Sequence, residues 1–414
     1  MKKIVVFLIL LSCVTVNVCT FVKAADSPQF RGPNRDGRFL DKGLMKSWPT
    51  GGPPLAWVKK DLGHGYSSVS VIGDTIYLPV AFDDEEAYVY ALDLDGNLKF
   101  KLPYGKETNN GQAPGNRSTP TIDGRRLYII SGLCVVHCFD LDTREKVWSV
   151  DALKEFQGKK VSWDFSESPL VYKNKVFCAP GGKNASVVAL DKMTGRTLWT
   201  SKDLSEASAY CSPDLIMHNN HPILVTMTAK SVVGLDPETG EIYWTHLHKT
   251  SYDIHGTTPV YADGMLYYTA GYDSGGGMLQ LSEDGKSVTP MWTEKSLDCQ
   301  HHGVVLVDGY IYGIGHEGED QLTCLELKTG NVMWRSPDVK QGVTIYADGM
   351  FYVYEGPSAG VVSLVKADPN QYTRTGSFKV TQGSGKHWAH PAIANGRLYI
   401  HHGDVLLAYD ITEK

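Results

Sequence analysis

The sequence contains no long hydrophobic run after its first two dozen residues, which argues against a transmembrane helix in the rest of the chain. It also lacks an adjacent cysteine pair and a Cys-X-X-Cys motif, so we interpret the six cysteines beyond residue 24 as small buried side chains rather than disulfide staples. No long segment shows a 3.6-residue periodicity, which argues against a helical fold. The formal net charge is only −6 in 414 residues, which argues against nucleic acid or anionic lipid as the main partner.

The one hydrophobic run lies at the start of the chain, in MKKIVVFLILLSCVTVNVCTFVKAAD. Two lysines, an apolar stretch and a small-residue exit have the layout of a secretory signal peptide, and we expect cleavage after Ala24. Cleavage removes three lysines and no acid, so the net charge changes from −6 to −9. Lipid attachment at Cys13 is an alternative, although Leu11 is bulky for a lipoprotein signal. The sequence therefore predicts an exported protein that is periplasmic or extracellular, either soluble or lipid-anchored at the envelope.

Two short motifs recur along the remaining chain. The first ends in an aromatic residue, as in ALDKMTGRTLW (189–199), GLDPETGEIYW (234–244) and CLELKTGNVMW (324–334). The second precedes it, as in STPTIDGRRLY (118–128) and TTPVYADGMLY (257–267). Asp-Gly between alternating apolar residues favours a tight hairpin, and Thr-Gly after a strand-ending acid favours a second turn. Each repeat is predicted to form four short antiparallel strands, A to D, with an aromatic residue at the end of strand D.

The strand-D aromatic residues give the number of repeats. Their spacing of about 46 residues is the length of a four-stranded propeller blade. We therefore expect an all-β, eight-bladed β-propeller in which these side chains pack between neighbouring blades. The eight aromatic residues are Trp57, Phe100, Trp148, Trp199, Trp244, Trp292, Trp334 and Phe378.

The two ends of the repeat region are mismatched, and circular closure explains the mismatch. PPLAWVKK (53–60) is a lone strand of type D, whereas residues 391–410 supply strands A, B and C without a D strand. We expect the N-terminal strand to complete the last blade, which removes two exposed sheet edges. The predicted organisation is a signal peptide over 1–24, an N-terminal extension over 25–52 and a propeller over 53–414.

These repeats resemble the PQQ-like eight-bladed propellers. That superfamily includes the quinoprotein alcohol dehydrogenases and the outer-membrane assembly lipoprotein of the BAM complex. The likeness covers roughly residues 53 to 410. The opening PQFRGPNRDG (28–37) is similar to the start of many secreted bacterial propellers. The resemblance implies the fold, whereas the function depends on the residues of the site.

The dehydrogenases of this superfamily hold their quinone between a tryptophan and a ring formed by two adjacent cysteines, with calcium bound by Glu and Asn. By that resemblance, Glu167 could correspond to the calcium ligand, and Trp163 or Trp388 to the stacking ring. The adjacent cysteines are missing, and no Asn or catalytic Asp aligns with the family pattern. We therefore expect no cofactor, and keep PQQ with calcium as the alternative.

Antiparallel strand order places the start of every strand A at one face of the ring, around the central channel. Most of the histidines fall on this face, so we expect a ligand site at the channel rim. Ordinary loop polarity and a transition-metal site remain as alternatives. Of the adjacent histidines in QHHG, we expect His302 to face the channel, because neighbouring strand residues point oppositely. The predicted rim residues are Arg117, Glu167, Tyr210, His255, His301, His302, Trp388 and His390.

These observations favour a binding or scaffold module without a catalysed reaction. The expected partner is a protein segment or a small polar or anionic molecule, with no nucleic acid. A PQQ-dependent or metal-dependent oxidoreductase is the alternative function, and the sequence does not identify catalytic residues.

Overall fold

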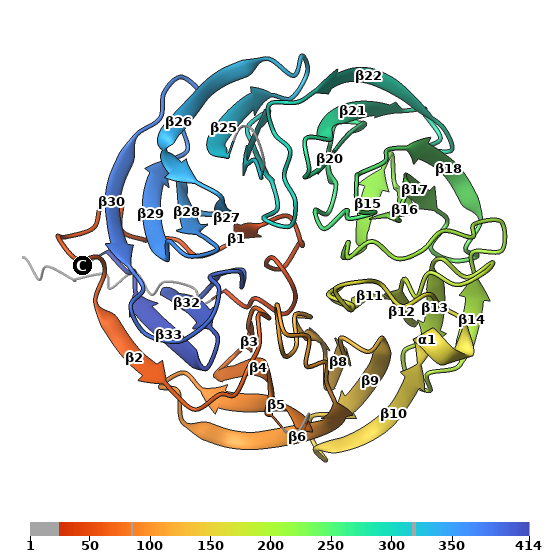
Figure 1. Ribbon diagram of the computed structural model, residues 1–414, viewed down its shortest axis with the longest axis horizontal. Helices are drawn as coiled ribbons and strands as arrows, with labels where there is room; N and C mark the ends of the chain where they lie inside the picture. The colour runs from red at the N-terminus through yellow and green to blue at the C-terminus, as the bar shows by residue number, and fades with distance from the viewer. Residues whose placement is uncertain (1–24, 84–85, 317–319, 414) are drawn as a thin grey trace, which may run out of the picture.

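The computed structural model describes residues 25–83, 86–316 and 320–413, so the predicted signal peptide lies outside the described residues. Eight sheets surround a central channel, and each contains four antiparallel strands (Figure 1). In seven blades these strands follow sequence order from the inside outward, and in the eighth an N-terminal strand is outermost. One sheet also carries a fifth, parallel strand at its inner edge. The described part of the chain contains one short helix, α1 (Ala152–Glu155). Among the described residues, no helix has the length and apolar character needed to cross a bilayer. The predicted all-β, eight-bladed propeller is confirmed.

The blades are numbered 1 to 8 from the blade that begins with β3. The innermost strands, A, are β3 (Ser70–Ile72), β7 (Thr121–Asp123), β11 (Leu170–Tyr172), β15 (Asp214–His218), β19 (Val260–Ala262), β23 (Val305–Val307), β27 (Gly342–Ala347) and β31 (Ala392–Ala394). Strands B are β4 (Thr75–Ala81), β8 (Arg126–Ile130), β12 (Lys175–Cys178), β16 (His221–Met227), β20 (Met265–Ala270), β24 (Tyr310–Ile314), β28 (Met350–Glu355) and β32 (Arg397–His402).

The outer half of each blade is formed by strands C and D. Strands C are β5 (Glu86–Asp93), β9 (Val135–Asp140), β13 (Val188–Asp191), β17 (Ser231–Leu235), β21 (Gly275–Leu281), β25 (Gln321–Glu326), β29 (Val361–Lys366) and β33 (Val405–Asp410). Strands D are β6 (Leu98–Lys106), β10 (Glu145–Asp151), β14 (Thr197–Thr200), β18 (Ile242–Leu247), β22 (Val288–Glu294), β26 (Val332–Lys340), β30 (Arg374–Lys379) and, for blade 8, β2 (Leu55–Lys59).

Blade 8 combines the two ends of the chain, as predicted. Strand β2 pairs antiparallel with β33, with Leu55 opposite Tyr409 and Lys59 opposite Leu406. Without β2, strand β33 would present unpaired backbone groups to solvent, and such an edge invites pairing with another chain. The N-terminal strand therefore completes the ring.

Neighbouring blades are joined by the strand-D aromatic residues. The indole N–H of Trp199 donates to the carbonyl of Pro237 in the C–D turn of the next blade, at 3.1 Å. The indole ring also lies against Gly240 of that turn, where a Cβ atom would come within 2.4 Å of the ring. The Thr-Gly of the repeat therefore has two roles: it supplies the left-handed residue of the turn, with φ of +77° at Gly240, and it leaves room for the indole. The indole N–H groups of the other five strand-D tryptophans each donate to a backbone carbonyl of the next blade. These tryptophans are Trp57, Trp148, Trp244, Trp292 and Trp334.

The two phenylalanines at this position have different partners. The ring of Phe100 faces Arg144, which replaces the turn glycine and lies with its guanidinium 4.5 Å from the ring centroid. Phe378 faces blade 8, whose C–D turn is formed by the two ends of the chain. There Gly52 takes the glycine position, with φ of +95°, and a Cβ atom at this position would come within 2.5 Å of the Phe378 side chain. The N-terminal segment thus supplies both the closing strand and the turn glycine of blade 8.

The residues before Leu40 lie inside the ring rather than outside it. We call residues 26–39 the channel segment, which crosses the centre of the ring in Figure 1. Ser27 exchanges two backbone hydrogen bonds with Val71 of blade 1, and strand β1 (Arg38–Phe39) pairs parallel with β27 of blade 7. The predicted N-terminal extension, residues 25–52, therefore includes the segment that fills the channel.

Two buried arginines anchor the channel segment. The Arg35 guanidinium donates to the carbonyls of Ser168 (3.0 Å), Pro169 (3.1 Å) and Pro213 (2.9 Å), which lie where strands A of blades 3 and 4 begin. Arg31 donates to the carbonyl of Val304 in blade 6 at 2.6 Å. Burial lowers the pKa of Arg35 to about 10, so the side chain stays charged at neutral pH. Charged donors on inner-strand carbonyls tie several blades to one central segment.

The contact between indole and turn glycine can be tested with two glycines of similar backbone conformation. Gly240→Ala should destabilise the protein by about 1–3 kcal/mol more than Gly349→Ala, because the new methyl group overlaps Trp199. Gly349 has φ of +81° and open space around the added Cβ, so it reports the backbone cost alone. Denaturant unfolding of both variants measures the difference, and equal losses would contradict the proposed contact.

The channel segment should contribute measurably to the stability of the whole ring. Arg35→Met leaves three buried carbonyls without their charged donor, and we expect a loss of about 2–4 kcal/mol. Arg38→Met is the matched control, because that side chain is exposed and its loss should cost less than about 0.5 kcal/mol. Thermal melts of both variants provide the comparison, and an unchanged melt for Arg35→Met would show that the segment is dispensable.

Candidate functional site

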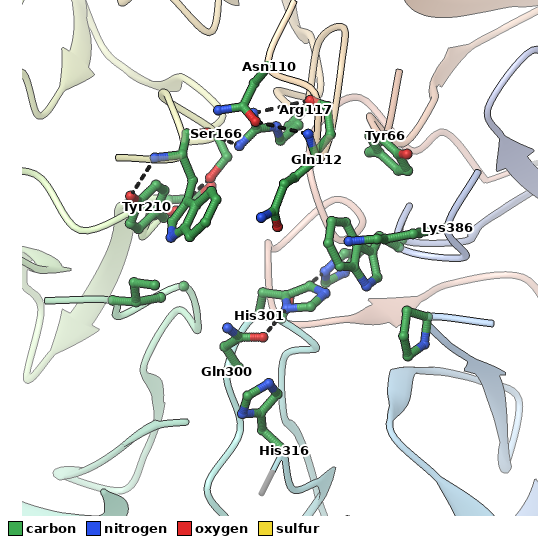
Figure 2. A pocket seen from close by; sticks show the side chains of 18 of the residues that line it. Tyr66, Asn110, Gln112, Arg117, Ser166, Tyr210, Gln300, His301, His316 and Lys386 are labelled. Carbon is green, nitrogen blue, oxygen red and sulfur yellow. Dashed lines mark hydrogen bonds between the residues drawn. The ribbon is translucent and has the colours of Figure 1, made fainter. Parts of the chain in front are cut away.

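A cavity of about 380 Å³ lies at the end of the channel where the innermost strands begin. We call it the channel-mouth cavity. Figure 2 shows its side chains around an open space, with Arg117 and Gln112 on one side and His301 and Gln300 on the other. All eight blades contribute to it from the residues just before strand A, namely Tyr66, Arg117, Ser166, Ser212, Gly256, His301, Gln341 and His390.

The channel segment closes this cavity from below. Phe30 lines the cavity, and its ring lies 4.9 Å from the ring of His390. The Nε2 atom of His390 lies 2.9 Å from the carbonyl oxygen of His301, which links blades 8 and 6 across the channel. The cavity is therefore a pocket with a floor rather than a section of an open pore.

Two cationic side chains line the cavity. Arg117 donates to the carbonyls of Trp163 and Ala113, and its buried Nε has no partner among the described residues. The ammonium of Lys386 lies 4.0 Å from the ring centroid of Trp388. No carboxylate belongs to the described lining. Behind the wall, Asp164 and Glu107 partly offset the charge of Arg117, so Lys386 is the cation that faces the cavity without a nearby carboxylate in the lining. Such a site favours a negatively charged or strongly polar ligand.

Aromatic side chains form much of the wall. The rings of Tyr66 and Trp388 are 5.7 Å apart, and the hydroxyl of Tyr210 accepts a hydrogen bond from the backbone N–H of Trp163 at 3.1 Å. Tyr210 and Tyr272 have φ of +74° and +63°, a conformation that costs a bulky residue about 1–2 kcal/mol. Strained residues of this kind concentrate at ligand sites, where the surroundings hold them in place.

His301 is a neutral group in this wall. Its Nδ1 lies 3.0 Å from Oε1 of Gln300, and its Nε2 has no partner among the described residues. Burial lowers the pKa of His301 to about 4, with His316 contributing, so the imidazole is uncharged at neutral pH. His301 therefore contributes an uncharged ring to the wall, with its unpaired Nε2 buried.

The expected order of the two adjacent histidines is reversed. His301 lines the cavity, whereas His302 is 2% exposed and lies behind it, with the two rings 4.2 Å apart. Strand alternation does not apply here, because β23 begins only at Val305 and both histidines lie in a bend. Gly303 turns the chain with φ of +72° and packs directly against Arg31, an arrangement that the sequence pattern does not reveal.

Five of the eight predicted rim residues line the cavity and three do not. Arg117, Tyr210, His301, Trp388 and His390 belong to the lining, whereas Glu167, His255 and His302 are buried behind it.

Glu167 and His255 face neighbouring backbone and side chains. Oε1 of Glu167 accepts from the backbone N–H of Ala179 at 2.8 Å, and burial raises the pKa of this carboxyl to about 8. Nε2 of His255 lies 3.2 Å from Nδ1 of His248. Both residues connect blade elements beneath the surface of the cavity.

Several lining residues were not among the predicted rim residues. Phe30 has no signal in the repeat pattern, because it precedes the first blade. Lys386 stands two residues before Trp388, so its position in the loop leading to β31 could have suggested it. The other unpredicted polar or aromatic members are Tyr66, Asn110, Gln112, Trp163, Ser166, Ser212, Tyr272, Gln300, His316 and Gln341.

The described residues do not fit a quinone held with calcium. They include no group of three or more His, Cys, Asp or Glu side chains that could hold a metal ion. Calcium requires carboxylate and carbonyl oxygens, yet the described lining offers no carboxylate. Glu167 is buried behind the wall, where Oε1 accepts from Ala179 and Oε2 has no partner among the described residues. We therefore derive no reaction step through such a cofactor.

One stretch has the spacing of a serine nucleophile motif. Gly356–Gly360 reads GPSAG, but it forms the turn between β28 and β29 rather than a strand–turn–helix. Ser358 makes no hydrogen bond to a described histidine, so the activating base that such a nucleophile requires is not in place.

Comparisons with known proteins agree with this architecture. Residues 85–336 match the family model described as outer membrane protein assembly factor BamB. Over 233 residues the chain is 23% identical to the outer membrane protein assembly factor BamB of Moranella endobia, covering 52% of this chain and 56% of that protein. Over 150 residues it is 27% identical to the quinoprotein alcohol dehydrogenase PedH of Pseudomonas putida, covering 34% of this chain and 24% of that protein.

These alignments thus span about a quarter and just over half of the two relatives. Among solved structures, the quinohemoprotein alcohol dehydrogenase from Comamonas testosteroni has a TM-score of 0.72 at 12% identity, covering 94% of this chain and 81% of that chain, which shows a shared fold. With more than half of its length matched by one family model and all eight blades in place, the chain belongs to the family of the outer membrane protein assembly factor BamB.

Proposed function

We propose that this protein is an exported binding module that holds a small polar or anionic molecule in the channel-mouth cavity. The observation that carries the proposal is the one-sided charge of the lining, which has Arg117 and Lys386 but no described carboxylate. The floor formed by Phe30 limits the cavity to one end of the channel and gives it the concave form typical of ligand sites.

Export is supported by the sequence of residues 1–24 and by the family description, which names an outer membrane protein assembly factor. That description also favours a protein partner, and a protein segment laid across the same opening is the other occupant to consider. A concave cavity of about 380 Å³ suits a small molecule better, because stable protein partners need a wider complementary surface.

A quinone-dependent oxidoreductase is the second candidate. The similarity to a protein named as a quinoprotein alcohol dehydrogenase favours it, and so do Trp163 and Trp388 in the cavity wall. The missing calcium donors among the described lining residues count against it.

Removal of one cavity cation should weaken the binding of small anions. For Lys386→Met, we expect the Kd of citrate to rise about three- to tenfold, because a half-buried charge pair is worth about 1 kcal/mol. Binding should also weaken as salt is added. Lys183→Met is the control, since Lys183 is exposed on the turn between β12 and β13 and lies outside the cavity.

Calorimetric titrations of both variants, with phosphate as a second probe, measure this effect. If wild-type protein bound neither citrate, phosphate nor other small carboxylates, the proposed anion site would be wrong.

The quinone alternative gives a separate prediction. Adding PQQ and calcium to purified protein should produce no dye-linked oxidation of simple alcohols, because the calcium donors are missing from the described lining. Tryptophan fluorescence should also show no tight quinone binding through Trp163 or Trp388. If the protein oxidised an alcohol only when both PQQ and calcium were present, the binding-module proposal would be wrong and the oxidoreductase would take its place.

A further inference from the structure

The aromatic side chains at the channel mouth are unusually exposed. Of the large hydrophobic side chains that are exposed in the described residues, two are aromatic: Trp163, at 39%, and Tyr252, at 67%. Both belong to this one region, since Trp163 lines the cavity and Tyr252 has its ring 4.8 Å from that of Tyr272, another lining residue. Exposed aromatic faces at a concave opening indicate a ligand with apolar faces of its own.

Carboxamides accompany these rings. The side chains of Gln112 and Gln341 line the cavity without a hydrogen-bond partner among the described residues, and Gln300 and Asn110 lie beside them. A carboxamide both donates and accepts, as does a hydroxyl group, whereas a phosphate or carboxylate requires donors alone. The neutral part of the lining therefore matches a ligand with several hydroxyl groups.

A second cavity continues the first. It has a volume of about 310 Å³ and shares Tyr66, Gln112 and Lys386 with the channel-mouth cavity. Its other walls come from loops rich in glycine, including Gly385 and Gly403, which bring backbone close to the space. Lys386 stands at the junction, where its ammonium is available to a group in either cavity. The pair of cavities suits an elongated ligand with a negative charge near its middle.

We propose that the two cavities bind a linear acidic oligosaccharide, a chain of hexuronic acid units. Sugar rings present C–H faces for Trp163 and Trp388, hydroxyl groups for Gln112 and Gln341, and carboxylates for Arg117 and Lys386. An acidic peptide would supply the charge but not the several hydroxyl groups that the carboxamides match. The channel segment also occupies the inner edges of blades 1 and 7, which an added strand could otherwise use. This inference rests on the proposed binding function and names its ligand class.

The test uses the full mature chain and three sets of ligands. The first is a series of galacturonate oligomers from one to four units, and the second is the same tetramer as its neutral methyl ester. The third set consists of non-sugar anions: citrate and a tetraglutamate peptide. Calorimetry and tryptophan fluorescence report binding. The expected result is a tetramer that binds at least tenfold more tightly than the monomer and at least tenfold more tightly than its methyl ester.

Variants connect the binding to these residues. Lys386→Met should weaken tetramer binding about tenfold, and Trp163→Ala should reduce both affinity and the fluorescence change. Lys183→Met should leave binding unchanged, and thermal melts should show that all three variants are folded. The replacement of Lys386 removes a cation–π contact with Trp388, and the thermal melt separates that loss from a change in ligand binding.

The outcomes separate the two proposals. If citrate or tetraglutamate binds with the same dependence on Lys386 while the uronate tetramer does not, the oligosaccharide is wrong and the anion-binding function stands. If the tetramer binds no more tightly than its methyl ester, the acidic character of the ligand is wrong. If no probe binds wild-type protein, both proposals fall together.

Discussion

The contact between each strand-D aromatic residue and the turn of the next blade is the interaction on which the ring depends. Hydrogen bonds of the sheets lie within blades, so they hold each blade together but do not fix one blade against another. The indole of Trp199 does so with an N–H bonded to one turn residue and a ring packed on another, Gly240. Repeated around the circle, this geometry brings eight strand starts to one opening. The cavity exists because the ring closes.

A closed ring alone would leave a hole in its centre, and the channel segment fills it. Burying an arginine costs free energy unless its N–H groups are hydrogen-bonded. The Arg35 guanidinium donates to three carbonyls that lie just before the inner strands. The same segment places Phe30 under the cavity. One stretch of fourteen residues, 26–39, therefore both adds contacts between blades and shapes the floor of the binding site.

The fold was predictable because its determinants are local and repeated: Asp-Gly hairpins, Thr-Gly turns and an aromatic residue every 46 residues or so. The site was only partly predictable, since its residues lie at positions that differ from blade to blade. The face could be inferred from strand order, which located Arg117 and Trp388. Whether His301 or His302 faced the cavity depended on a glycine bend and on Arg31, a residue 270 positions away in the chain, and no local pattern carries that information.

The route of the channel segment also fixes which way the molecule faces. Asp26 accepts a hydrogen bond from Gly73, and Asp41 accepts one from Gly396; both glycines lie in A–B turns, on the face opposite the cavity. The chain thus enters and leaves the channel on that opposite side. Any tether joined ahead of residue 26, whether a lipid or a support in the laboratory, would attach the protein through the face that is opposite the cavity. The cavity would then open away from the surface to which the protein is attached.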